Sequence, residues 1–76
     1  MAKAYVLITT DPAAMNRVAD HLRTLPSVQE AHEVMGPYDI VAEVEVANID
    51  DMGELLRERI RTIDGVRSTL TCVTIS

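Results

Sequence analysis

The residues of this chain best suited to bind a small molecule lie in one short segment, Gly36, Pro37, Tyr38 and Asp39. Its ordinary role would be a hairpin turn, in which glycine and proline supply the backbone geometry and Tyr38 packs. The segment also has binding chemistry, because backbone N–H groups at a turn can hold a carboxylate and the Asp39 side chain can hold an ammonium group. We therefore treat it as a candidate binding site.

The other titratable side chains are better explained by structure than by catalysis. Glu30, His32 and Glu33 would need a second set of ligands at matched spacing to bind a metal, and a solvated edge strand explains them better. Glu43 and Glu45 share one strand face, but acid–base catalysis requires carboxyls in different environments. We predict no catalytic residue, no metal site and no cofactor, and therefore a protein that is not an enzyme.

Composition narrows the function further. The chain has 76 residues, a formal net charge of −5, and neither Trp nor Phe. No basic stripe is present to replace counterions along a phosphate backbone, and few rings are available to stack on bases. The apolar runs are far shorter than a membrane span, and one cysteine makes no disulfide framework. We expect a cytoplasmic protein that contacts neither nucleic acid nor membrane.

The apolar pattern repeats when the chain is shifted by 38 positions. In each copy an alternating apolar segment is followed by a segment with helical spacing and then by a second strand, the pattern of a β-α-β unit. Two such units predict an α+β fold of the ferredoxin-like βαββαβ type, with two helices on one face of a four-stranded antiparallel sheet. The aligned pairs include Val6 with Val44, Ile8 with Val46, Leu22 with Ile60 and Val28 with Val66.

Capping residues and apolar spacing place the two helices. Asp11 followed by Pro12 is an N-cap with proline at the first helical position, and Pro26 ends that helix. Asn48 caps the second helix and Gly65 follows its end. The expected buried stripes are Met15, Val18, Ala19, Leu22 and Leu25 on the first helix, and Ile49, Met52, Leu56, Ile60 and Ile63 on the second.

Four strands are expected, and the first and third should be central because they are the most apolar. The sequence does not fix the register of the second strand, since either Glu30 and His32 or Glu33 would turn toward the helices unless a bulge intervenes. Cys72 should face the helices as a small buried hydrophobe. The strands span residues 5–10, 28–35, 40–46 and 66–75.

The sheet face opposite the helices is expected to carry an apolar patch, larger than a monomer of this size normally leaves in water. A chain this short buries only roughly 60% of its unfolded surface, so a partner would add needed stability. We expect a homodimer formed through this face. The outer residues are Tyr5, Leu7, Val41, Val73 and Ile75, with Thr69 and Thr71 among them, while Ala4, Val6, Ile8, Ile40, Ala42, Val44 and Val46 face the helices.

The chain resembles the effector domain of the Lrp/AsnC family of feast-or-famine regulators, known as the RAM domain. The resemblance covers nearly the whole sequence. It rests on three segments: Leu-Pro-Ser-Val at positions 25–28, Gly-Pro-Tyr-Asp-Ile at 36–40, and Asp-Gly-Val-Arg-Ser-Thr-Leu-Thr at 64–71. We expect residues 1–76 to form one such ligand-binding domain, standing alone without the helix-turn-helix of full-length members.

The resemblance implies a dimer whose sheets face each other, with dimers assembling into rings such as octamers or decamers. It also implies a small effector, usually an amino acid, held between subunits. Gly36, Tyr38 and Asp39 would come from one subunit, and Thr69 and Thr71 from its neighbour. The proline at position 37 departs from the family pattern and removes one backbone donor.

These observations favour an oligomeric regulator that senses an amino acid and modulates transcription through full-length Lrp/AsnC relatives, without binding DNA itself. Three alternatives remain open at this point, one of which is a purely structural ring-forming module with a vestigial pocket. An ACT-type regulatory domain shares the strand order and would bind its ligand at the loop after the first strand. A small dimeric α+β-barrel enzyme would need a titratable pair inside the cavity lined by the sheet.

Overall fold

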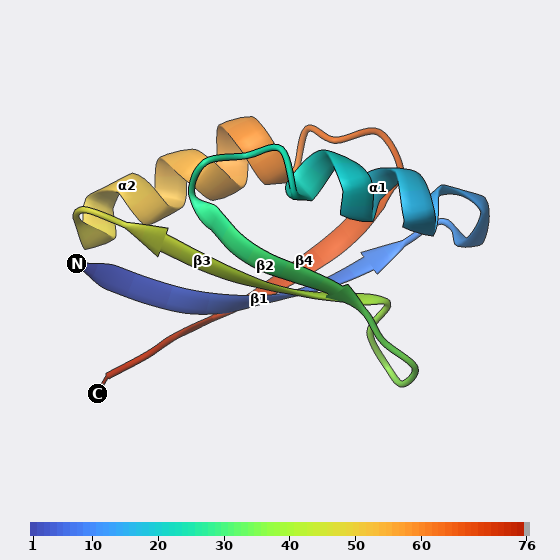
Figure 1. The fold of residues 1–76 in the computed structure, drawn as a ribbon, viewed down its shortest axis with the longest axis horizontal. Coiled ribbons are helices and arrows are strands. Elements are labelled where there is room, and N and C mark those ends of the chain that lie inside the picture. Colours follow the sequence, from blue (N-terminus) through green and yellow to red (C-terminus); the bar gives the residue numbers. More distant parts are fainter. Residues whose placement is uncertain (76) are drawn as a thin grey trace.

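The computed structural model describes residues 1–75 and shows one four-stranded sheet with helices on one face (Figure 1). Every pair of neighbouring strands is antiparallel, and the order β2-β3-β1-β4 makes the first and third strands central, as predicted. The predicted βαββαβ arrangement is confirmed. Its elements are β1 (Ala2–Thr10), η1 (Pro12–Ala14), α1 (Met15–Leu22), β2 (Val28–Glu33), β3 (Ile40–Val46), α2 (Ile49–Glu54), η2 (Leu55–Ile60) and β4 (Val66–Val73).

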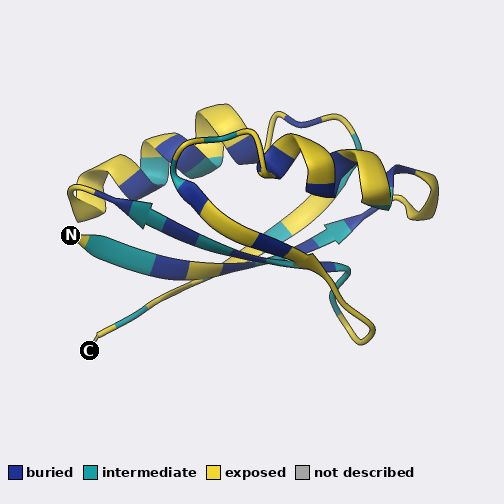
Figure 2. Cartoon of the chain, in the orientation of Figure 1, coloured by how far each residue is buried: buried dark blue, intermediate teal, exposed yellow. Residues whose placement is uncertain are grey.

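The core lies between the sheet and the helices. Alternate residues of β1 and β3 are buried there, so buried and more exposed segments alternate along these strands (Figure 2). The helices contribute Val18, Ala19, Leu22, Met52 and Ile60 from the other side. The predicted inward set of the central strands is confirmed, because Ala4, Val6, Ile8, Ile40, Ala42, Val44 and Val46 are all buried.

The second helix differs from the regular helix that we expected. After α2 the chain continues as a π-helix, η2, in which the Arg61 N–H donates to the Leu56 carbonyl at 2.8 Å. The wider turn changes which side chains face the sheet. Leu55 is buried although the predicted stripe omitted it, and Ile49, a predicted member, is 54% exposed.

A bulge fixes the register of β2. Val28 pairs with Val44 and Glu30 with Glu43, so one extra residue, Gln29, lies on the β2 side. The extra residue lets Val28 and Ala31 both face the core, although their spacing of three does not fit a regular strand. Glu30 and His32 consequently lie on the outer face, and both are exposed.

A second bulge reverses the faces that we predicted for β4. Thr10 pairs with Val66 but Thr9 pairs with Ser68, so Arg67 is the extra residue. Without it, Thr69 would lie opposite Leu7 on the outer face; with it, Thr69 lies opposite Ile8, on the helix side.

The prediction for the last strand was therefore wrong in its orientation. Thr71 pairs with the inward-facing Val6, and Val73 with the inward-facing Ala4. Cys72 was expected to be buried but is exposed, opposite Tyr5 on the outer face. Leu70, opposite Leu7, takes the outward position that was assigned to its neighbours.

Gly65 allows β4 to approach the start of the first helix. Its backbone has φ +104°, a conformation that L residues rarely adopt. A Cβ built there would lie 2.6 Å from the Ala14 Cβ and 3.3 Å from a methyl group of Val18. The Gly65 carbonyl also accepts the Asp11 N–H at 2.9 Å. This close approach fixes the point at which β4 begins.

Replacing this glycine tests the packing directly. We expect Gly65→Ala to lower the free energy of unfolding by about 3 kcal/mol, because positive-φ strain and overpacking against Ala14 each cost about 1–3 kcal/mol. Urea unfolding at fixed protein concentration measures the change.

Gly53→Ala is the matched control. Gly53 lies in α2, and an added Cβ there would meet only the flexible end of Arg57. This variant should gain up to about 1 kcal/mol, since alanine is the better helix former. Equal effects at the two positions would contradict the close approach at Gly65.

Candidate functional site

The segment that carried the binding prediction is a hairpin loop joined firmly to the end of β1. The Asp39 N–H donates to the Ile8 carbonyl at 2.9 Å, and the Asp39 carbonyl accepts the Val34 N–H at 2.9 Å. The Asp39 Oδ2 atom accepts the Thr10 N–H at 2.8 Å. Both backbone and side chain of Asp39 are thus fixed, and one carboxylate oxygen remains for another donor.

The tip of this hairpin projects beyond the sheet (Figure 1). Gly36 and Pro37 are exposed, and a Cβ built on Gly36 would meet nothing within 4 Å. Met35 is fully exposed, while Tyr38 is half-buried. The loop therefore has a fixed base at Asp39 and an open tip, an arrangement suited to contact with a second molecule.

The two threonines predicted for the site lie on the helix side of β4. Both are half-buried. Thr69 is engaged by a residue that we did not single out from the sequence, because the Arg61 Nε–H donates to the Thr69 Oγ1 at 3.2 Å. Thr71 follows along the same face, opposite Val6.

Within one chain, the hairpin and Thr69 lie at the same end of the sheet, on opposite sides of β1. Ile8 of the central strand pairs with Ile40 on one side and with Thr69 on the other. Two strand spacings amount to roughly 10 Å. The structure thus places Asp39 and Thr69 at one end of the molecule, but it does not bring their side chains into one pocket of a single chain.

The outer face of the sheet is a separate surface. Its apolar members are Tyr5, Leu7, Val41, Leu70 and Cys72, which we call the outer patch. The prediction named Val73 and Ile75 in place of the last two. Val73 faces the helix side, and Ile75 lies beyond the last residue of β4.

Charged side chains border the outer patch. Lys3 Nζ lies 3.8 Å from the Glu43 carboxylate, and the His32 Nε2 lies 2.8 Å from the Glu30 Oε1. His32 is exposed on an edge strand, away from any enclosed cavity identified among residues 1–75. These groups form a polar rim around the outer patch.

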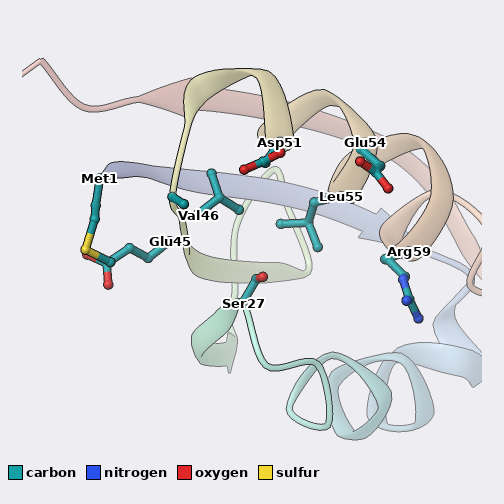
Figure 3. Close-up of a pocket in the computed structure, with 9 residues that line it drawn as sticks. Met1, Ser27, Glu45, Val46, Asp51, Glu54, Leu55 and Arg59 are labelled. Atoms are coloured by element: carbon teal, nitrogen blue, oxygen red, sulfur yellow. The ribbon is translucent and has the colours of Figure 1, made fainter.

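A shallow, open pocket of about 460 Å³ lies at the other end of the molecule, beside α2 and η2 (Figure 3). Leu55 and Val46 supply apolar lining, and Asp51, Glu54 and Arg59 supply charges. We did not predict this pocket from the sequence, because its residues come from segments that only the fold brings together.

Two structural observations bear on other kinds of site. Within the described residues, no three His, Cys, Asp or Glu side chains gather in an arrangement that could hold a metal ion. No helix in that part of the chain is both long enough and apolar enough to cross a bilayer.

Comparison with known proteins identifies the family. The family model described as the Lrp/AsnC ligand binding domain matches residues 3–76. An uncharacterized HTH-type transcriptional regulator of Pyrococcus furiosus is 38% identical over 73 residues, which are 92% of this chain and 49% of that protein. A solved protein of Thermus thermophilus is 29% identical with a TM-score of 0.95, and the match covers 100% of this chain and 95% of that one.

A further solved relative is a complex with a small molecule. The feast or famine regulatory protein from M. tuberculosis, complexed with L-methionine, is 30% identical with a TM-score of 0.85, and the match covers 100% of this chain and 51% of that one. The fold and the matches together define a ligand-binding domain of transcriptional regulators. This chain belongs to the Lrp/AsnC family, and it spans about half the length of the curated relatives it matches.

The family assignment confirms the resemblance and decides against the ACT-type alternative. Two of the matched curated relatives are named as HTH-type transcriptional regulators. These names favour a regulatory role over the barrel-enzyme alternative. The five predicted ligand-binding residues stay a prediction.

The hydrogen bond between the Thr10 N–H and the Asp39 carboxylate should contribute measurably to the stability of the fold. Asp39→Ala should lower the free energy of unfolding by about 1–2 kcal/mol, because it leaves the N–H of Thr10, a buried residue, without its acceptor. Asp39→Asn is the matched control, since its amide oxygen can still accept that hydrogen. Urea unfolding of the two variants should therefore separate them; the same loss in both would show that the charge, and not the hydrogen bond, stabilises the hairpin.

Proposed function

We propose that this chain is a small-effector-binding regulatory domain, that its effector is an amino acid, and that the effector binds between subunits. The observation that carries the proposal is the family match together with a fixed carboxylate, Asp39, at the base of an exposed hairpin. A free carboxylate oxygen held in place is suited to an ammonium group. The relative described as complexed with L-methionine supports the choice of ligand class.

The reversed orientation of β4 bears on where the effector would bind. Thr69 and Thr71 lie on the face opposite the outer patch, so stacking of two outer faces does not enclose them. We therefore assign the effector to a different contact, in which Gly36, Tyr38 and Asp39 of one subunit approach Thr69 and Thr71 of another from the helix side. Dimer contact and effector contact are separate surfaces in this proposal.

The outer patch is the proposed dimer contact. Leu70 is 48% exposed and Tyr5 is 41% exposed, on a sheet face that no helix of the described chain covers (Figure 2). Apolar area of this kind, bordered by charged groups, is typical of a contact between protein subunits. A second copy of the same sheet offers a matching apolar surface. Assembly of such dimers into an octamer or decamer ring is part of the same proposal.

The charge distribution supports regulation through other proteins and not through DNA contact by this domain. Three arginines are already engaged by acidic partners: Arg17 by Asp64, Arg23 by Asp20 and Arg67 by Asp11. A surface with net charge −5 repels a phosphate backbone. We propose that the domain modulates transcription through full-length Lrp/AsnC relatives, by sharing effector or by mixed assembly.

Calorimetric titration with each of the twenty amino acids tests the sensing function. We expect at least one to bind the wild-type protein, and we expect Asp39→Asn to weaken that binding at least tenfold, because the variant loses the charge but keeps the tie to Thr10. Asp50→Asn, on α2, is the control and should bind as wild type does. No heat with any amino acid would contradict the sensing function and leave the assembly open.

A charge placed on the outer patch tests the dimer. Leu70→Asp should shift sedimentation at micromolar concentration toward the 8.4 kDa monomer, since a dimer would bury an unpaired carboxylate. Ile49→Asp is the control, because Ile49 is also exposed but belongs to α2, away from the outer patch. A wild-type monomer, or equal dissociation by both variants, would contradict the proposed contact.

A further inference from the structure

We infer that Arg61 and Thr69 bind the carboxylate of the effector, so that the site selects a ligand with a free carboxylate over the corresponding amine or amide. This inference rests on the proposed function and names the second half of the same site. Asp39 supplies a place for the ammonium group, but the five residues predicted from the sequence include no cation for the opposite end of an amino acid.

The hydrogen bond between the two side chains leaves donors free. Arg61 uses its Nε–H on the Thr69 Oγ1, at 3.2 Å. The four remaining guanidinium N–H groups are available, and a hydroxyl that accepts one hydrogen bond can still donate its own hydrogen. An arginine fork beside a hydroxyl donor is a geometry that matches a carboxylate.

Arg61 is also less neutralised than its neighbour in the fold. Arg67 Nε lies 3.4 Å from an Asp11 carboxylate oxygen, whereas no carboxylate of residues 1–75 lies within 4.0 Å of the Arg61 guanidinium. Arg61 therefore supplies a positive charge without a carboxylate partner among these residues, in a protein that is negative overall. An anionic group is attracted to such a point.

A hollow of about 280 Å³ exists at this point, lined by Arg61, Val66, Arg67, Ser68 and Thr69. Its lining combines two guanidinium groups, two hydroxyls and one apolar side chain. The volume is near the lower end of what small-molecule sites occupy, so it fits the polar end of an amino acid better than a whole larger ligand. The rest of the ligand must be covered by something else.

The hollow beside Arg61 does not contain the hairpin of its own chain. Asp39 and Thr69 flank the central strand with their backbones roughly 10 Å apart, and Asp39 is absent from the lining of the hollow. The two charged groups of an α-amino acid are attached to one carbon atom and therefore lie close together. We assign the hairpin that contacts a ligand bound at Arg61 to a neighbouring subunit.

Titration with ligands that differ only in the carboxylate tests this inference. The probes are L-methionine, L-methioninamide and 3-(methylthio)propylamine, with the same comparison for any other amino acid that binds. Wild type should prefer L-methionine to the other two by at least tenfold. Arg61→Gln should lose at least tenfold in affinity for L-methionine and keep its weak affinity for the amide, which abolishes the preference. Arg61→Lys should recover part of it, because the charge remains but the fork does not.

Arg57→Gln, on the same helical segment, is the matched control and should keep the full preference. A loss of preference cannot come from a merely structural role of Arg61, because misfolding would weaken all three ligands together. If wild type binds an amino acid and Arg61→Gln keeps the tenfold preference, the inference is wrong and the proposed function stands. If wild type binds none of the amino acids, the proposed function fails and takes this inference with it.

Discussion

Because side chains alternate along a strand, the single extra residue where β4 meets Thr9 and Thr10 decides which β4 side chains lie on each face of the sheet. The bulge at Arg67 turns Leu70 and Cys72 outward and moves Thr69 and Thr71 to the helix side. It lies two residues after Gly65, where the chain enters β4 so close to the first helix that a Cβ would overlap Ala14. The apolar contact surface and the polar binding residues are thereby separated onto opposite faces of one strand.

This separation lets one small domain serve two contacts at once. An apolar sheet face can pair with a copy of itself, while polar groups at the end of the sheet stay accessible for a ligand. If the threonines had remained outward, a stacked sheet would bury their hydroxyls in an apolar contact, at a cost of about 1–3 kcal/mol for each unpaired group. The bulge removes that conflict.

Much of the fold could be predicted because local signals agreed with each other. The repeat of 38 positions, the proline after Asp11 and the apolar alternation of the central strands all indicated the same βαββαβ order, and Ile8 and Ile40 are buried as expected. Two of the errors come from an irregularity of a single residue. The π-helical turn allows Leu55 and Ile60, five residues apart, both to be buried, and the bulge at Arg67 exchanged Thr69 for Leu70. Periodicity cannot reveal an inserted residue, because every position beyond it still fits a regular pattern.

The candidate site was only partly visible in the sequence for a related reason. Gly36, Tyr38 and Asp39 are contiguous or nearly so, and their turn chemistry could be recognised directly. Arg61 follows the π-helix and Thr69 follows the bulge, and no sequence spacing indicated the contact between them.

The most direct test of the account is a crystal structure of the protein grown with an amino acid that binds it. The account predicts the ligand carboxylate within hydrogen-bonding distance of Arg61 and Thr69, and the ligand ammonium group against the Asp39 carboxylate contributed by a second subunit. A ligand lying between two outer sheet faces, away from Arg61, would contradict it.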